Sequence, residues 1–158
     1  MKDNIVIATI KSWNIDNFLI LKNKLLNSYN INLISNKDDL NLKYIEELNP
    51  KYIFFPHWSW IIPENIYSNF ECIVFHMTDL PFGRGGSPLQ NLIYRDIEYT
   101  KISAIKVEKG IDTGRVYIKE DLFIGLGNAD EIFEKASNII FNKMIPNILE
   151  NNITPIDQ

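Results

Sequence analysis

Short apolar runs alternate with amphipathic stretches through the first half of the chain. The apolar runs have the length of buried strands, and they cover residues 4–10, 31–34, 51–55 and 72–75. Between the runs, helices are predicted from a shared face of Phe18, Leu21, Leu25 and Leu26 and from the patterns over residues 40–48 and 63–70. This alternation predicts a parallel sheet with helices on both faces.

The second half has a different pattern. A short helix is predicted over residues 88–94, and residues 102–107 and 115–124 alternate as antiparallel or edge strands do. A long helix is expected over residues 130–145, with Asn128 as its N-cap. Pro146 is predicted to end or kink that helix, because proline lacks a backbone N–H. The pattern predicts a single α/β domain over residues 1–150, with antiparallel C-terminal strands, and a polar, loosely ordered tail over residues 151–158.

Composition narrows the class of protein. The chain has 158 residues, of which 46% are hydrophobic and 23% charged, as in ordinary globular proteins. Its net charge of −4 disfavours nucleic acid as a partner. The single cysteine, Cys72, lies in an apolar run and fits a buried thiol in a reducing compartment. With no membrane-spanning run and no signal peptide pattern, we expect no membrane partner and a cytoplasmic location.

Two titratable residues, His76 and Asp112, stand at positions typical of an active site. His76 comes directly after the run 72–75 and precedes a glycine-rich loop, and Asp112 lies between Gly110 and Gly114. Ligands of open α/β sheets bind at the carboxyl ends of the strands, which makes this pair a catalytic candidate. Taken singly, such a histidine is more often structural and such an aspartate more often a turn residue. Two histidines and one cysteine give no metal-ligand cluster, so no metal is expected.

Two further strand ends carry candidate contacts. The segment after the first run, residues 8–14, has no glycine, which argues against a dinucleotide pyrophosphate there. Its Lys11, Ser12 and Asn14 either contact a substrate or cap the next helix. The segment 54–63 is rich in aromatic residues and proline, and it forms either a wall for a flat heterocycle or packing under the next helix.

These motifs resemble those of the formyltransferase family that uses N10-formyltetrahydrofolate. The family's loop motif, Asn-x-His followed by Ser-Leu-Leu-Pro, Arg-Gly and Pro, is matched by His76, Leu80, Pro81, Arg84, Gly85 and Pro88. Its Asp-x-Gly turn is matched by residues 110–114, and its folate-binding segment resembles residues 58–63. The resemblance covers residues 51–124 and implies a modified Rossmann-like sheet.

The resemblance implies roles for specific residues. His76 is expected to donate to the oxyanion formed during formyl transfer, and Asp112 to orient the imidazole and help remove the proton of the amine. The residues expected to bind N10-formyltetrahydrofolate are Phe55, Pro56, His57, Trp58, Ile61, Val107, Glu108, Lys109 and Gly110. Those expected to bind the acceptor are Lys11, Trp13, Thr78, Arg84, Gly85, Ser87 and Asn91.

One position departs from the family pattern. The family's catalytic asparagine precedes the histidine by two residues, and Val74 occupies that position here. Valine cannot donate a hydrogen bond, so either another group supplies the donor or activity is impaired. His57, Thr78 and Asn91 are the candidates for this replacement.

The acceptor is expected to be a small molecule. The chain is acidic, ends at Gln158 without a tRNA-binding extension and lacks a glycine-rich phosphate loop after its first strand. These features favour a resemblance to small sugar formyltransferases of pseudaminic-acid-type pathways, which act on a primary amine of a UDP- or dTDP-linked sugar. The partners considered are this nucleotide sugar and a second copy of the chain in a homodimer. The alternatives are another amine, on an aminoacyl carrier or methionyl-tRNA, a non-catalytic folate- or nucleotide-sugar-binding protein, and a domain in which His76 and Asp112 are structural.

Overall fold

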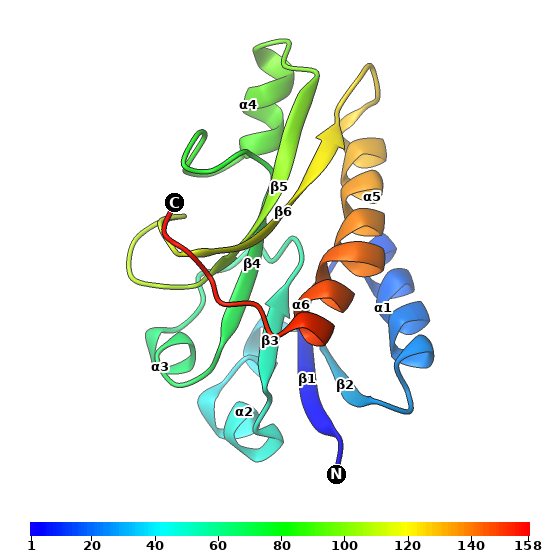
Figure 1. Ribbon diagram of the computed structural model, residues 1–158, viewed down its shortest axis with the longest axis vertical. Coiled ribbons are helices and arrows are strands. Elements are labelled where there is room, and N and C mark those ends of the chain that lie inside the picture. Colours follow the sequence, from blue (N-terminus) through cyan, green and yellow to red (C-terminus); the bar gives the residue numbers. More distant parts are fainter. The chain divides into compact units, whose positions relative to one another are not determined.

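The computed structural model describes residues 1–158 and has the α/β architecture that the sequence predicts (Figure 1). Its six strands follow the hydrogen-bonded order β2-β1-β3-β4-β5-β6. The pairs β1–β2, β1–β3 and β3–β4 are parallel, whereas β5 and β6 are antiparallel. The chain divides into two units, Met1–Val74 and Phe75–Gln158, and each is described separately.

The first unit is built from βαβ repeats. Its elements are β1 (Asp3–Ala8), α1 (Ser12–Lys24), β2 (Tyr29–Ile34), α2 (Leu42–Leu48), β3 (Tyr52–Phe55), α3 (Glu64–Tyr67) and the first residues of β4 (Cys72–His76). The connections that run outward to β2 and back to β3 place α1 on one side of the strands and α2 and α3 on the other (Figure 1). This confirms the predicted order of elements.

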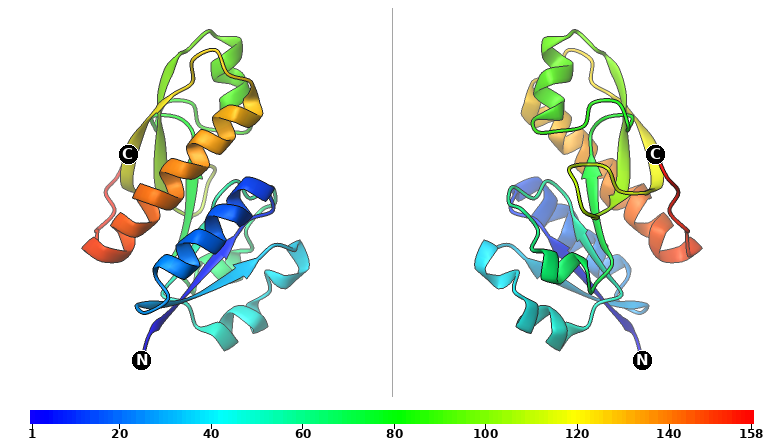
Figure 2. Two further views of the ribbon diagram at one scale, coloured as in Figure 1. Left: turned by 90° about the vertical axis from the view of Figure 1, so that its right-hand side faces the viewer. Right: turned by 90° about the vertical axis from the view of Figure 1, so that its left-hand side faces the viewer.

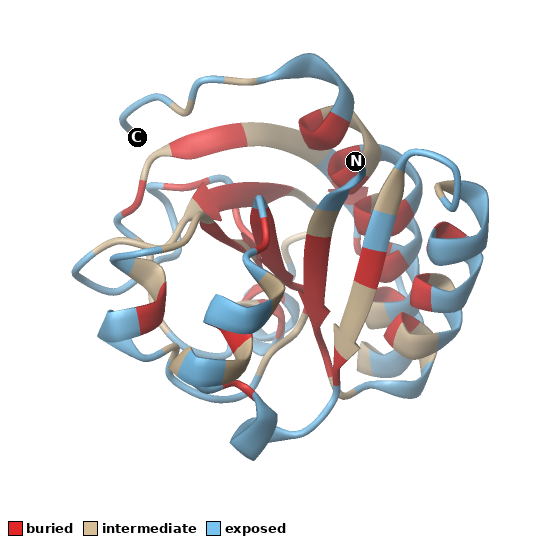
Figure 3. Ribbon diagram, turned by 90° about the horizontal axis from the view of Figure 1, so that it is seen from below, coloured by how far each residue is buried: buried red, intermediate tan, exposed pale blue.

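Burial explains why the parallel strands read as continuous apolar runs. Ile5, Val6 and Ile7 of β1 are fully buried, as are Ile53 and Phe54 of β3. In Figure 3, the strand that starts at the marked N-terminus is buried through most of its length. Strands covered on both faces have no solvent side, and the alternation of polar and apolar residues is therefore lost.

The face predicted for the first helix is partly wrong. Phe18 and Leu21 are buried, whereas Leu26 is 55% exposed. The helix α1 ends at Lys24, and the N–H of Leu25 closes the last turn by donating to the carbonyl of Leu21. Leu26 therefore lies beyond the helix, where helical spacing no longer decides which residues face the interior.

The second unit contains a hairpin and a long helical segment. It contains α4 (Pro88–Tyr94), β5 (Tyr99–Lys106), β6 (Val116–Phe123), α5 (Ala129–Ile139), the π-helical turn η2 (Ile140–Met144) and α6 (Ile145–Asn151). The prediction for Asn128 is confirmed, because its side chain caps α5 by accepting from the N–H of Glu131. Figure 2 shows α5, η2 and α6 as one continuous helical run, coloured orange to red.

Pro146 does not end this run. The turn before it is π-helical, and Pro146 stands in the first turn of α6, a position that proline occupies without ending a helix. Ile145, Ile148 and Leu149 beyond it are buried. The tail also differs from the expected loose order, because Ile156 forms an antiparallel bridge with Val116 and Gln158 makes side-chain hydrogen bonds.

Candidate functional site

His76 is the last residue of β4, and only 7% of its surface is exposed. Its Nε2 lies 2.7 Å from the carbonyl oxygen of Gly83. A carbonyl oxygen can only accept, so Nε2 carries a hydrogen and donates it to Gly83. The strand end and the loop that follows it therefore hold the imidazole in one orientation, with Nδ1 directed elsewhere.

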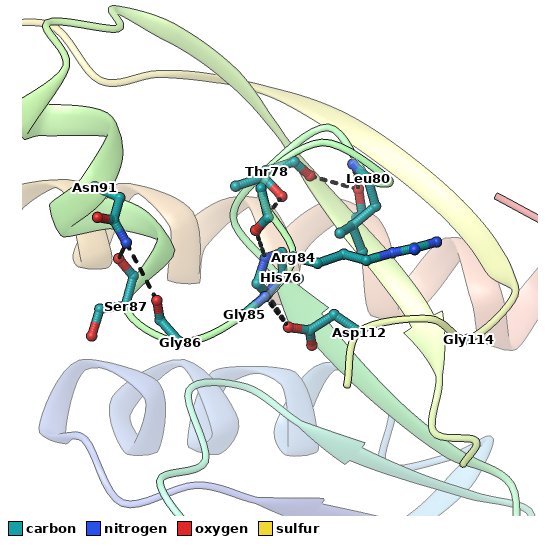
Figure 4. A network of polar contacts seen from close by, with 12 residues as sticks. His76, Thr78, Leu80, Arg84, Gly85, Gly86, Ser87, Asn91, Asp112 and Gly114 are labelled. Atoms are coloured by element: carbon teal, nitrogen blue, oxygen red, sulfur yellow. Dashed lines mark hydrogen bonds and ion pairs between the residues drawn. The ribbon is translucent and has the colours of Figure 1, made fainter. Parts of the chain in front are cut away.

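Asp112 lies beside that second ring nitrogen. Its Oδ2 is 3.6 Å from Nδ1 of His76 and also accepts the N–H of Gly85 at 2.9 Å (Figure 4). The predicted meeting of His76 and Asp112 is thus found in the structure, entirely within the second unit. The carboxylate faces the ring nitrogen that Gly83 leaves unused, which is the arrangement required of a partner for an imidazolium.

The turn that carries Asp112 is set by backbone constraints. Asp112 has a φ of 54°, a left-handed conformation that aspartate tolerates better than most residues. At Gly114, an added Cβ would run into the carbonyl of Lys106, so only glycine fits against β5 there. Glycine at this position lets the turn pass close to β5. This path of the turn directs the carboxylate of Asp112 at His76.

Hydrogen bonds and close packing fix the conformation of the loop after His76. Thr78 is buried, its hydroxyl donates weakly to the Gly83 carbonyl at 3.4 Å, and its own carbonyl accepts from the hydroxyl of Ser103 on β5 at 2.7 Å. Gly83 has a φ of 73°, and an added Cβ would lie 2.6 Å from Cγ2 of Thr78. The acceptor of the His76 hydrogen bond is therefore held in place by close packing.

A pocket of about 130 Å³ opens between this loop and α4. Arg84, Arg95 and Asn91 line it, together with apolar and backbone groups, and no carboxylate does. Asn91 donates to the carbonyls of Ser87 and Gly86, which fixes the start of α4. The five acceptor-binding residues predicted in this unit, Thr78, Arg84, Gly85, Ser87 and Asn91, thus belong to one loop-and-helix segment, although Gly85 and Ser87 do not line the pocket.

The polar groups of residues 107–110 make hydrogen bonds to the turn that follows them. Glu108 accepts from Nε and Nη2 of Arg115 at 3.1 and 2.8 Å, and hydrogen bonding to that side chain lowers the pKa of the carboxyl group. The hydroxyl of Thr113 donates to the carbonyl of Lys109, and Gly110 has a φ of 104°. Of the predicted folate contacts in this unit, Val107, Glu108, Lys109 and Gly110, the carboxylate of Glu108 is therefore already engaged.

In the first unit, a polar cluster lies at the carboxyl ends of β1 and β3. The fully buried Asn14 has its Nδ2 3.0 Å from Thr9 Oγ1, 3.2 Å from the Pro56 carbonyl oxygen and 3.0 Å from Nδ1 of His57, and the two hydrogens of the amide are shared among these three acceptors. Thr9 donates to the same carbonyl at 2.7 Å. Asn14, which the sequence analysis considers as a substrate contact or a helix cap, thus joins the two strand ends.

Burial keeps His57 neutral. Desolvation, with a smaller contribution from the positive charge of Lys11, lowers the pKa of His57 from 6.5 to about 4. Since Nδ1 accepts from the amide of Asn14, the hydrogen of the neutral ring is on Nε2. The residue has a φ of 54°. Of the three proposed replacements for the family asparagine, His57 is thus in this cluster, whereas Thr78 and Asn91 bond to the loop after His76.

Aromatic residues after β3 line a second pocket, of about 240 Å³. Trp58 and Trp60 meet edge to face with ring centroids 4.9 Å apart, and Phe55 contacts Trp58 at 6.1 Å. Trp58, Trp60 and Ile61 line the pocket, and the side chain of Ile61 is almost fully exposed. The predicted folate contacts Trp58 and Ile61 therefore lie together, next to Pro56 and His57 in the chain.

Lys11 and Trp13, the acceptor contacts predicted at the first strand end, lie at the start of α1. The ammonium of Lys11 is 6.0 Å from the centroid of the Trp13 ring. The side chain of Lys11 does not cap the helix, although its backbone position is that of the N-cap.

No group of three or more potential metal-ligating side chains is found in residues 1–158. None of the helices has both the length and the apolar character needed to cross a bilayer.

Comparison with known proteins identifies the family. No family model matches the chain. A methionyl-tRNA formyltransferase from Campylobacter jejuni is 30% identical over 123 residues, which are 77% of this chain but 40% of that protein. The chain thus spans about two fifths of the length of such curated relatives. The solved structure of a methionyl-tRNA formyltransferase from Clostridium thermocellum is 58% identical, with a TM-score of 0.97 over 99% of this chain and 68% of the other.

A more distant structure shares the fold alone. The formyltransferase PseJ from Anoxybacillus kamchatkensis, solved with a UDP-linked formamido sugar and tetrahydrofolate, is 18% identical with a TM-score of 0.71 over 98% of this chain and 81% of the other. The match to the Clostridium thermocellum protein, in contrast, combines high identity with nearly complete coverage of this chain. The chain therefore belongs to the formyltransferase family.

Proposed function

We propose that this protein is an N10-formyltetrahydrofolate-dependent N-formyltransferase in which His76 and Asp112 carry the chemistry. The observation that supports this most directly is the 3.6 Å approach of Asp112 Oδ2 to Nδ1 of His76. In the reaction, the amine nitrogen attacks the formyl carbon and the bond from that carbon to N10 breaks. The amine loses one proton and N10 gains one, so no metal and no covalent enzyme intermediate enter the balance.

The role of His76 is to stabilise negative charge on the formyl oxygen. An oxyanion would be repelled at Nδ1, where the Asp112 carboxylate lies, so it binds at Nε2. In the structure, Nε2 donates to the Gly83 carbonyl. The formyl oxygen would therefore share the Nε2 hydrogen with the Gly83 carbonyl. Asp112 remains as the charge partner of the imidazolium and accepts the amine proton directly or through water.

For the folate, the residues of the aromatic segment in the first unit are the proposed contacts. The faces of Trp58 and Trp60 and the exposed side chain of Ile61 suit a flat pterin ring. The buried indole N–H of Trp58 has no hydrogen-bond partner in the structure, which leaves it as a donor for a ligand or for an ordered water. Thr9, Asn14 and His57 hold the strand ends beside this segment.

For the acceptor, the α-amine of methionyl-tRNA is the leading candidate. The protein that is 58% identical to this chain carries that name, and so do the curated relatives. The sugar acceptor favoured by the sequence analysis therefore becomes the second candidate. It is supported by the net charge of −4 and by the small size of the Arg84–Arg95 pocket.

Both acceptors carry phosphate, and we place it in the Arg84–Arg95 pocket. The only side-chain partner of Arg84 is the neutral amide of Gln158, and Arg95 has no ion-pair or side-chain hydrogen-bond partner in the structure. An Arg95→Leu variant is expected to raise KM for the acceptor with little change in kcat, because the lost contact lies away from the reacting atoms. An unchanged KM would remove the phosphate from this pocket.

The test of function is transfer itself. The protein is incubated with N10-formyltetrahydrofolate and either methionyl-tRNA or a panel of UDP- and dTDP-linked amino sugars. Released tetrahydrofolate is followed by absorbance and the formylated product by mass spectrometry, with His76→Ala as the control. Product from one acceptor class identifies the acceptor. Folate binding without any product contradicts the proposal and favours the non-catalytic binding protein.

A further inference from the structure

The segment after α6 returns to the active-site turn. The N–H of Ile156 donates to the carbonyl of Val116 at 2.9 Å, and the N–H of Val116 donates to the carbonyl of Ile156 at 2.7 Å, next to the Asp112 turn. Two residues further on, the side chain of Gln158 lies against that turn. The bridge at Ile156 determines where Gln158 is placed, although Ile156 itself is 69% exposed.

The amide of Gln158 uses its hydrogen-bonding capacity in full. Its Nε2 donates to the carbonyls of Asp112 and Gly114 at 2.7 and 2.8 Å, and its Oε1 accepts from Nε and Nη2 of Arg84 at 3.1 and 2.8 Å. A primary amide offers two donors and one oxygen with two lone pairs, and all are matched here.

These contacts join the two segments that form the catalytic pair. Arg84 belongs to the loop after His76, and its neighbour Gly85 donates to the carboxylate of Asp112 at 2.9 Å. Gln158 fastens the backbone of Asp112 on one side and the side chain of Arg84 on the other. Hydrogen bonds therefore connect the loop and the turn at two places, through Gly85 and through Gln158. Figure 4 shows the hydrogen bond from Gly85.

We propose that Gln158 is a positioning residue. Its hydrogen bonds connect the Asp112 turn to Arg84 and so keep the Asp112 carboxylate facing His76. It touches neither reacting atom and acts through Asp112. The inference rests on the proposed function for its effect on turnover. The effect on the turn, however, is a property of the protein alone.

The experiment compares Gln158→Met and Gln158→Glu with Asp157→Asn. Methionine has a similar size and makes none of the four hydrogen bonds. Glutamate keeps an acceptor for Arg84 but loses both donors to the turn. Asp157 is the exposed neighbour with no side-chain partner, so Asp157→Asn is the matched control. Amide hydrogen exchange at Gly85, measured by NMR without substrate, reports the hydrogen bond to Asp112, and melting curves verify that each variant is folded.

We expect faster exchange at Gly85 in both Gln158 variants and unchanged exchange in Asp157→Asn. With substrates, kcat should fall on the order of 10- to 100-fold while the KM for folate stays near its original value, as for a small displacement of a catalytic group. Unchanged exchange at Gly85 in a folded Gln158→Met variant overturns the inference, whether or not formyl transfer is observed. Absence of transfer in the original protein instead overturns the proposed function and leaves the exchange result to decide on Gln158.

If Gln158→Met does not fold, Arg84→Met removes only the contacts on the loop side of the link. Faster exchange at Gly85 in that variant supports the cross-link, and unchanged exchange contradicts it.

Discussion

The two histidines of this chain follow neighbouring strands in the sequence, yet their surroundings assign them opposite properties. His57 comes after β3, its Nδ1 lies 3.0 Å from the amide nitrogen of Asn14, and the only charge that acts on its pKa is the positive charge of Lys11. His76 ends β4 and faces the carboxylate of Asp112. The first ring is held neutral by burial, whereas the second has a partner for positive charge. The charge that a histidine carries is thus decided by its burial and by the charged groups that face it.

The largest effect is expected from removing the charge beside His76. Asparagine tolerates the left-handed backbone of position 112 and still accepts from the Gly85 N–H, so Asp112→Asn changes charge with little change in shape. We expect kcat for formyl transfer to fall about 100- to 1000-fold. Asp79→Asn, in the same loop but paired with Lys119, is the control and should keep most activity. Equal losses in both variants would show that the carboxylate has no special role.

Next comes the pH dependence of stability that His57 causes. Its folded-state pKa of about 4 lies below the ordinary 6.5, so the unfolded chain binds more protons between these values. The free energy of unfolding should therefore fall as the pH drops from about 6.5 to about 4, by at most about 3 kcal/mol from this residue. Urea denaturation across this range, compared with His57→Asn, isolates the contribution. A variant with the same slope as the original protein would refute a buried neutral ring.

A smaller effect tests the loop that holds His76. Gly83→Ala introduces a methyl group 2.6 Å from Thr78 at a φ of 73° and should lower the free energy of unfolding by about 1 to 3 kcal/mol. Gly86→Ala is the matched control, because open space surrounds that position, and it should change stability by about 0.5 kcal/mol or less. Similar denaturation midpoints for the two variants would mean that the loop adapts freely.

The smallest effect separates the two causes of the low pKa of His57. Lys11→Gln removes the positive charge but leaves the burial, which is the larger cause. The pKa of His57, measured by NMR titration of the imidazole, should rise slightly and remain well below 6.5. A return to the ordinary value would show that the charge of Lys11, and not desolvation, keeps the ring neutral.

The fold was largely predictable because its parallel strands are buried on both faces. Such strands appear as uninterrupted apolar runs, and the helix between residues 88 and 94 was also predicted with its correct bounds. His76 and Asp112 were found because one ends a strand and the other lies between glycines. Burial of Asn14 and the contacts of Gln158 left no such trace, since a hydrogen bond formed between distant segments imposes no period on the sequence. Leu26 was misplaced because no capping residue marks the end of α1 at Lys24.

Gly114 offers a criterion for sorting other sequences of this fold. Any side chain at that position would collide with the Lys106 carbonyl and force the turn off the strand. The aspartate two residues earlier would then be carried away from the histidine, even if both were still present in the sequence. A chain that keeps the histidine and the aspartate but has lost this glycine should therefore be examined as a protein that binds without reacting.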